Sequence, residues 1–118
     1  MPKPKPIPPA LLQIEIPADV KEDIMSVMDT LLGKFAFNIK KIILYGSYAK
    51  NRYQPDSDVD IAVVLITMPE KKERRNYTQA VDLERDIDLL FCSEMQLESN
   101  KMVYRSINER GVLLYEQL

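Results

Sequence analysis

The feature that most constrains this chain is an apolar run over residues 61–66, which directly follows three alternating aspartates, Asp56, Asp58 and Asp60. The run is rich in β-branched residues and apolar at both odd and even positions, which predicts a central strand covered on both faces. Side chains alternate along a strand, so Asp58 and Asp60 share a face about 6–7 Å apart. Two anions this close repel each other, and a cation or water must separate them.

Composition indicates a single globular domain. The chain has 118 residues, of which 46% are hydrophobic and 29% are charged. A core without disulfides or structural metals is feasible at this length. The formal net charge is −2, which argues against a broad electrostatic grip on nucleic acid.

The cysteine and histidine counts exclude several kinds of site. Cys92 is the only cysteine and there is no histidine, so an intrachain disulfide and His-based zinc sites or general bases are excluded. Cys92 has apolar neighbours and is expected to be a small core residue. No apolar run approaches the roughly 20 residues that a membrane span needs. With no secretory signal, we expect a cytoplasmic protein.

The pattern of elements predicts an α/β (α+β) fold, with a mixed sheet of about three to five strands flanked by helices. Residues 1–17 form an expected Pro/Lys-rich arm, in which 10–16 are either a short edge strand or a segment packed on the body. Residues 18–118 form the expected domain. Its elements are predicted as helices over 17–37 and 70–83, one or two helices over 93–111, and strands over 41–45, 59–66, 86–92 and 112–118.

A second acidic strand follows the first. Asp86 and Asp88 share one face of the strand predicted over residues 86–92. If this strand lies beside residues 59–66, Asp88 can join Asp58 and Asp60. Three carboxylates could then hold two Mg²⁺ ions, since Mg²⁺ prefers oxygen ligands and completes its shell with water and substrate phosphates. A two-metal site can serve an in-line phosphoryl displacement, and Asp88 could accept the proton of the attacking hydroxyl.

Gly46 and Ser47 follow the strand predicted over residues 41–45. A glycine there lets the backbone approach a phosphate closely. A helical turn starting at Ser47 would offer free amides to an anion, with Lys50 and Arg52 as counter-charges. Taken singly, Gly-Ser reads as a turn, Asp-Ser-Asp as a loop or helix cap, and Asp88 as an edge-strand charge. Together, the Gly-Ser pair, Asp58 and Asp60, and the second acidic strand indicate a catalytic site.

These residues resemble a known family. Gly46-Ser47, ten intervening residues and Asp58-Val59-Asp60 match the G-S-x10-D-x-D signature of the polymerase-β-like nucleotidyltransferase superfamily. The short chain resembles its minimal nucleotidyltransferase branch over roughly residues 20–115. The resemblance implies a mixed sheet flanked by helices that binds Mg²⁺ and ATP, the nucleotide donor.

The resemblance also implies a role for each matching residue. Gly46 and Ser47 would contact the triphosphate, and Asp58 and Asp60 would ligate metal. Asp88 matches the third acidic position, as a ligand and base. Asp86 occupies the same face and is the alternative third acid, whereas Asp56 is expected to shape the loop.

The chain departs from the family after Ala49. Many members carry Arg-Gly where this sequence has Lys50-Asn51. Lysine keeps the positive charge at the triphosphate but loses the bidentate fork of arginine. Asn51 can adopt the left-handed conformation that glycine would supply.

The family resemblance implies a partner. Many minimal members are encoded with a HEPN-domain toxin and act as antitoxins, transferring AMP from ATP to a tyrosine of that toxin; some form homodimers. One alternative is a non-catalytic antitoxin that masks the surface of its partner. Another is a transferase subunit linked to DNA or RNA, suggested by the basic run at residues 71–75.

Overall fold

The computed structural model describes residues 9–81 and 86–117, so residues 1–8 of the expected arm lie outside the described residues. In chain order the elements are α1 (Pro9–Gln13), α2 (Ala18–Phe35), the 3₁₀ helix η1 (Ala36–Asn38), β1 (Ile39–Tyr45), β2 (Val59–Leu65), α3 (Lys71–Ala80), β3 (Ile87–Ser93), α4 (Glu94–Leu97), α5 (Met102–Arg110) and β4 (Val112–Glu116).

The strands form one mixed sheet in the order β3-β2-β1-β4. β2 and β3 run parallel, whereas β1 is antiparallel to both β2 and β4. β2 is therefore an interior strand, as its apolar pattern predicted, and the expected fold class of a mixed sheet flanked by helices is confirmed.

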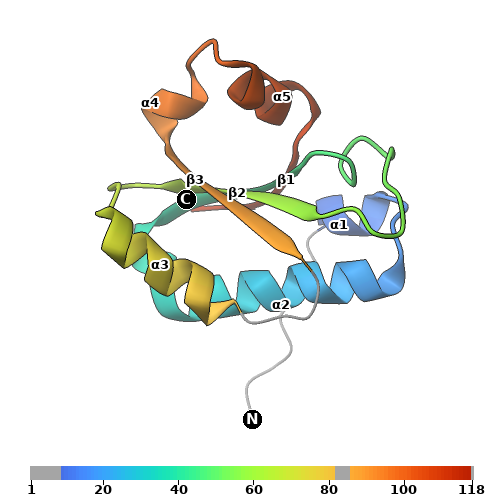
Figure 1. The fold of residues 1–118 in the computed structure, drawn as a ribbon, viewed down its shortest axis with the longest axis horizontal. Helices are drawn as coiled ribbons and strands as arrows, with labels where there is room; N and C mark the ends of the chain where they lie inside the picture. The colour runs from blue at the N-terminus through green and yellow to red at the C-terminus, as the bar shows by residue number, and fades with distance from the viewer. Residues whose placement is uncertain (1–8, 82–85, 118) are drawn as a thin grey trace.

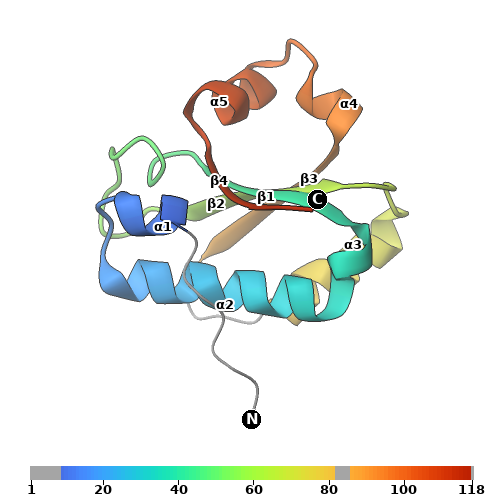
Figure 2. The same cartoon turned by 180° about the vertical axis from the view of Figure 1, so that it is seen from behind.

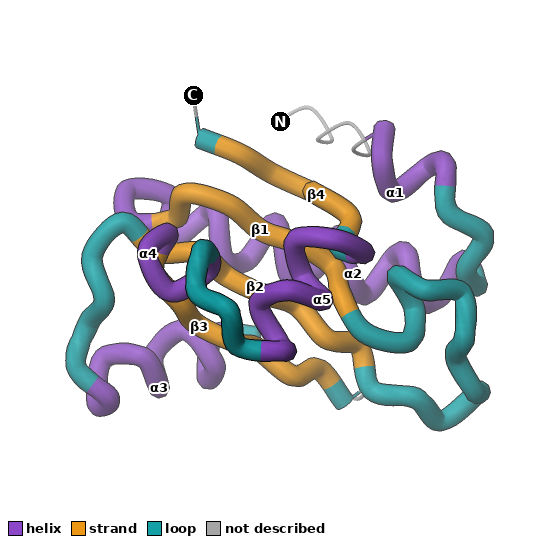
Figure 3. Tube along the Cα trace, turned by 90° about the horizontal axis from the view of Figure 1, so that it is seen from above, coloured by secondary structure: helices purple, strands orange, loops and turns teal. Residues whose placement is uncertain are grey.

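Helices cover both faces of the sheet (Figure 1). α2 and α3 lie against one face, α4 and α5 lie against the other, and the view from behind shows the same two layers (Figure 2). Seen from above, α4 and α5 cross over β1, β2 and β3 (Figure 3). Each layer buries its own apolar cluster against the sheet.

α2 forms because its apolar residues recur every three or four positions on one face. Five of them are buried: Val20, Ile24, Val27, Met28 and Leu31. The expected helix over residues 17–37 is confirmed, with its last turn tightened into η1.

Asn38 connects the far ends of β1 and β2 to α3. Its side-chain amide donates to the carbonyl of Thr67 at 2.8 Å and to the hydroxyl of Tyr77 at 3.2 Å. Its Oδ1 accepts from the Thr67 amide at 2.8 Å. A buried amide with all of these partners helps to define how β1 and β2 align, because shifting either strand would leave polar groups unpaired.

Some boundaries differ from the expectations. Residues 9–13 form helix α1 and not an edge strand; Pro9 suits the first turn of a helix. Leu11 is fully buried in the core, so this segment packs on the body, the second of the two expected arrangements. α3 ends at Ala80, and residues 82–83 of its predicted range lie outside the described residues. Across residues 9–81 and 86–117, no helix has the length and apolar character to cross a bilayer.

The core beneath β2 allows a direct test of the fold. Ile61 is fully buried, whereas Ile66, just beyond the end of the same strand, is 52% exposed. We expect Ile61→Ala to lower the free energy of unfolding by about 2–5 kcal/mol, through lost burial and the cavity left behind. Ile66→Ala should cost less than about 1 kcal/mol. Urea denaturation of both variants measures the difference, and equal losses would contradict the central position of β2.

Candidate active site

Tyr45, Asp60 and Asp88 lie side by side on three neighbouring strands. Tyr45 of β1 is paired with Asp60 of β2, which is paired with Asp88 of β3. Residues in register project from the same face of a sheet, and adjacent strands are about 4.8 Å apart. This face is the one that α4 and α5 cover, because Ala62 and Cys92, which share the face, belong to the core cluster beneath those helices.

The charges around Asp60 distinguish the candidate acids. Its pKa is raised above the usual 3.8, first by burial, then by the charge of Asp88 and then by that of Asp58. Asp56 and Asp86 are not among these causes. The structure therefore groups Asp60 electrostatically with Asp88 and Asp58, the set expected from the sequence.

Asp86 has a different position in the structure. It lies one residue before β3, where its backbone carbonyl accepts a hydrogen bond from the amide of Val59 at 3.0 Å. That bond joins the beginnings of β2 and β3. Asp88, in contrast, lies inside β3 with an exposed side chain at the edge of the sheet.

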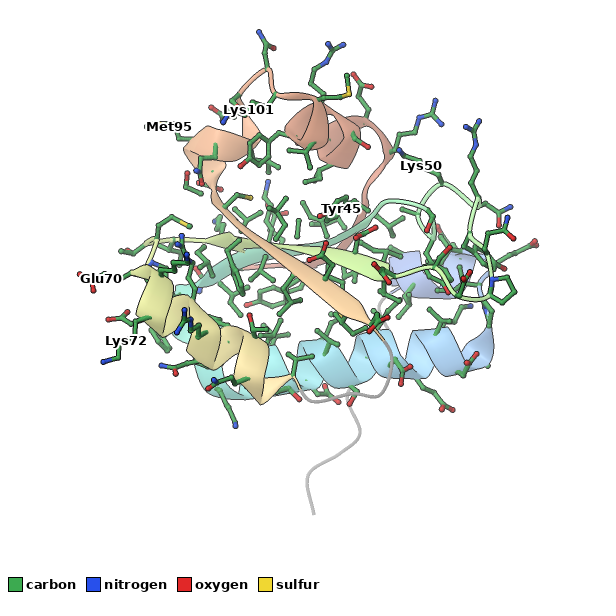
Figure 4. The ribbon with its side chains drawn as sticks, viewed as in Figure 1. Tyr45, Lys50, Glu70, Lys72, Met95 and Lys101 are labelled. Atoms are coloured by element: carbon green, nitrogen blue, oxygen red, sulfur yellow. The ribbon has the colours of Figure 1, made fainter. Side chains whose placement is uncertain are left out.

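Tyr45 is a member of the cluster that the sequence reasoning missed. Burial raises its pKa to about 12, with further contributions from Asp60, Asp88, Cys92 and Tyr104. The phenol therefore stays protonated at neutral pH and can donate a hydrogen bond. The only sequence signal was its position as the last strand residue before Gly46. Tyr45 is partly buried, and Figure 4 shows Lys50 at the surface.

Gly46 passes directly over the carboxylate of Asp60. Its φ is +77°, a conformation that favours glycine. A Cβ atom built on Gly46 would overlap Oδ2 of Asp60 and lie 3.0 Å from its Cγ. The glycine thus serves two needs at once, a left-handed turn and close contact with a carboxylate.

Residues 47–51 form a turn and not a regular helix, where a short helical turn was expected over residues 47–50. The Lys50 amide donates to the Gly46 carbonyl at 3.1 Å, and the Arg52 amide donates to the Ser47 carbonyl at 2.9 Å. Asn51 has φ of +56°, which confirms the left-handed conformation expected where the family has glycine.

Tyr48 fixes the turn to the core. It is buried and stacks on Tyr53 with ring centroids 4.7 Å apart. The backbone amides of residues 47–49 donate to no backbone carbonyl within the part of the chain that the structure describes. They are available to an anion in front of the turn.

The acidic side chains of the site could supply only part of the coordination shell of Mg²⁺; substrate phosphates and water would supply the rest. Within residues 9–81 and 86–117, no three acidic, cysteine or histidine side chains are arranged to hold a metal ion by themselves. Mg²⁺ commonly needs only one or two carboxylates, together with substrate phosphates and water. Asp58 and Asp60 offer such oxygens. Burial, and then repulsion from Asp88 and Asp58, raises the pKa of Asp60, and a divalent cation would relieve that repulsion.

Cys92 is a core residue, as expected. It is fully buried in β3, and burial raises the pKa of its thiol to about 11. A thiol held protonated is a poor nucleophile and a poor metal ligand.

The contact between Gly46 and Asp60 generates the next prediction. Gly46→Ala should lower the free energy of unfolding by on the order of 1–3 kcal/mol, because it adds both backbone strain and an overlap. Gly33→Ala is the matched control: Gly33 lies in α2 with nothing within 4 Å of its Cβ position. There the same substitution should stabilise by roughly 0.5–1 kcal/mol. Urea denaturation of both variants tests this, and a neutral Gly46→Ala would contradict the contact.

The pKa of Asp60 generates a pH prediction. That pKa is raised in the folded state. Between pH 3.8 and the pKa of the folded state, the folded chain therefore binds more protons than the unfolded chain. The free energy of unfolding falls as the pH rises through this interval. At pH 7 the charge of Asp60 therefore costs stability. We expect Asp60→Asn to have a higher urea midpoint than the wild type at neutral pH.

The same comparison across pH contains its own control. The advantage of Asp60→Asn should shrink as the pH falls below that interval, because the wild-type carboxyl is then neutral in both states. Asp56→Asn, in the exposed loop, should change stability by less than about 0.5 kcal/mol at any pH. A less stable Asp60→Asn at pH 7 would mean that the carboxylate has a stabilising partner.

Comparison with known proteins agrees with this geometry. A protein of Methanocaldococcus jannaschii with the provisional name protein adenylyltransferase is 36% identical over 62 residues, covering 52% of this chain and 56% of that relative. The chain thus spans about half the length of this curated relative.

Two solved structures share the fold. A toxin–antitoxin complex crystallised with AMP-PNP contains a chain that is 25% identical, with a TM-score of 0.58 over 81% of this chain and 73% of the other. A nucleotidyltransferase, so named provisionally, from Sulfolobus solfataricus is 17% identical, with a TM-score of 0.60 over 87% of this chain and 91% of the other. At this identity the second likeness shows the fold alone.

The family match covers both halves of the site. The family described as Polymerase beta, Nucleotidyltransferase matches residues 27–117, a range that includes the Gly46-Ser47 turn, β2 with Asp60 and β3 with Asp88. The chain is a minimal nucleotidyltransferase domain and belongs to the polymerase beta nucleotidyltransferase family.

Proposed function

We propose that this chain transfers AMP from ATP to a hydroxyl group of a partner protein. The observation that carries the proposal is the alignment of Asp60 with Asp88, electrostatically coupled to Asp58 and directly beneath Gly46. Acids placed under a turn with free amides suit a reaction at a phosphate. The name of the M. jannaschii relative, a protein adenylyltransferase, supports AMP as the transferred group.

The turn would bind the triphosphate. The amides of residues 47–49 and the hydroxyl of Ser47 can donate to phosphate oxygens, and Gly46 lets the backbone approach them. Lys50 adds a positive charge at the end of the turn, where it is exposed and free to reach an anion. Because lysine acts as a point charge, it would restrain the phosphates less rigidly than arginine.

Asp58 and Asp60 are the residues that would hold Mg²⁺, with Asp88 beside them. When bound, two ions would neutralise charge on the attacking and leaving oxygens of the displacement. Asp60 is half-buried, and its carboxylate lies directly under Gly46. Tyr45, paired with Asp60 in the sheet, lies beside this carboxylate with its phenol protonated at neutral pH.

Asp88 would act as the base. Its side chain is exposed on the edge strand β3, so an acceptor can approach it from solvent. It would take the proton from the acceptor hydroxyl as that oxygen forms a bond to the α-phosphorus. The bond between the α-phosphorus and the oxygen bridging to the β-phosphate breaks, and pyrophosphate leaves.

The acceptor that we propose is a tyrosine of a HEPN-type toxin, with this chain as the antitoxin, acting in the cytoplasm where ATP is available. The likeness to a chain of a toxin–antitoxin complex with AMP-PNP supports this assignment. The proposed unit for this role is the domain over residues 18–118, with residues 1–17 as an arm.

The test is transfer of label from α-³²P-ATP with Mg²⁺ to the protein encoded next to this chain. We expect Asp58→Asn/Asp60→Asn to abolish transfer and Asp88→Asn to lower it by about 10²–10⁴-fold, the usual contribution of a general base. Asp56 is also an aspartate but lies in the loop, so Asp56→Asn is the matched control and should keep full activity. Asp86→Asn should also keep most activity, because Asp86 is not grouped with Asp60.

Two results would contradict the proposal. If Asp58→Asn/Asp60→Asn and the wild type leave equal label on every acceptor, the site does not catalyse transfer. If the same double variant still neutralises the toxin completely in cells, masking of a surface and not modification is the antitoxin activity.

A further inference from the structure

A groove of about 630 Å³ lies between the turn that follows Gly46-Ser47 and helix α5. Lys50 and Arg52 line it from the turn, and Met102, Arg105, Glu109 and Arg110 line it from α5. We call these six residues the basic groove. None of its α5 residues belongs to the proposed catalytic set.

The charge of the basic groove is opposite in sign to that of the whole chain. Four cations and one carboxylate line it, although the chain has a formal net charge of −2. Within the described residues, Arg105 alone among the four cations has an acidic partner, Glu109 at 3.9 Å, and both side chains are about two-thirds exposed. Such a surface pair is weak, so the groove presents unbalanced positive charge to an anionic occupant.

The chemistry of the lining favours a protein segment over a nucleic acid. Among the described residues, no aromatic side chain lines the groove, so these residues offer no stacking platform of the kind on which single-stranded nucleic acid is usually held. Met102 is 86% exposed, and an exposed methionine suits an adaptable apolar contact with a peptide.

The position of the groove connects it to the reaction. Lys50, in its wall, is held by a hydrogen bond from its amide to the carbonyl of Gly46 at 3.1 Å, so the groove begins where the proposed triphosphate turn ends. We propose that the basic groove docks an acidic, partly apolar segment of the acceptor protein and so presents its hydroxyl to Asp88. This inference rests on the proposed function and names the class of acceptor.

The binding test uses a fluorescein-labelled octapeptide, Glu-Asp-Leu-Tyr-Glu-Asp-Leu-Glu, and its Gln/Asn counterpart, measured by anisotropy without nucleotide. The acidic peptide should bind more tightly, and its affinity should fall as salt is raised. The variant Arg105→Glu/Arg110→Glu should weaken it by roughly tenfold or more. Arg105→Gln/Arg110→Gln, which perturbs the helix less, should weaken it by a smaller factor in the same direction.

The matched control reverses two charges elsewhere. Lys72 and Arg75 are exposed on α3, on the opposite face of the sheet, and Lys72→Glu/Arg75→Glu changes the net charge by the same amount. It should leave peptide binding unchanged. Affinity for Mg-ATP should be unchanged in both variants, and circular dichroism with urea midpoints verifies that all of them fold.

The transfer test separates the two proposals. With α-³²P-ATP and Mg²⁺, label on the acidic peptide should exceed label on the neutral one, and the α5 variants should raise KM with kcat retained. Groove-dependent binding of the peptide, with no label on the peptide or on the protein encoded next to this chain, overturns the proposed function and supports the docking surface. Transfer that ignores peptide charge and the α5 variants overturns the docking surface alone.

Two further outcomes would overturn this docking inference. If a labelled single-stranded RNA of equal charge binds more tightly than the acidic peptide and depends on Arg105 and Arg110, the occupant is nucleic acid. If affinity for Mg-ATP falls with peptide affinity in the α5 variants, the groove belongs to the nucleotide site.

Discussion

Pairing between β2 and β3 places Asp60 and Asp88 side by side against their own repulsion. Seven residue pairs from Val59 to Leu65 maintain this alignment along the whole of β2. The apolar residues that follow Asp60 are buried on both faces of the sheet, and their burial offsets the unfavourable charge at the end of the strand. The cluster of acids thus depends on the hydrophobic core that holds β2 in place.

Much of this arrangement could be predicted from the residues. β2 was evident from an apolar run with no polar face, and α2 from apolar residues spaced for one helix face. The family resemblance placed Asn51 where many members have glycine, and asparagine can adopt the left-handed conformation that glycine supplies; its φ of +56° agrees. These features are local, so the chain pattern is sufficient to indicate them.

The features that escaped prediction are not local. Tyr45 joins the acids because β1 pairs with β2 in a register that no short pattern reveals. Asp86 and Asp88 shared a predicted face, and only the position at which β3 begins separates them. The basic groove joins the turn after Gly46 to α5, two segments about fifty residues apart, so neither segment indicates it alone.

The contact between Gly46 and Asp60 has a consequence for how such a protein can change over time. A turn proposed to bind phosphate and a carboxylate proposed to bind metal could in principle vary separately, one residue after another. Here the Cα of the first lies against the side chain of the second, so a larger residue at position 46 would displace the acid at position 60. Positions 46 and 60 can therefore change only together, in evolution or in design. Changes in nucleotide preference are expected at residues further from this contact, beginning with Lys50.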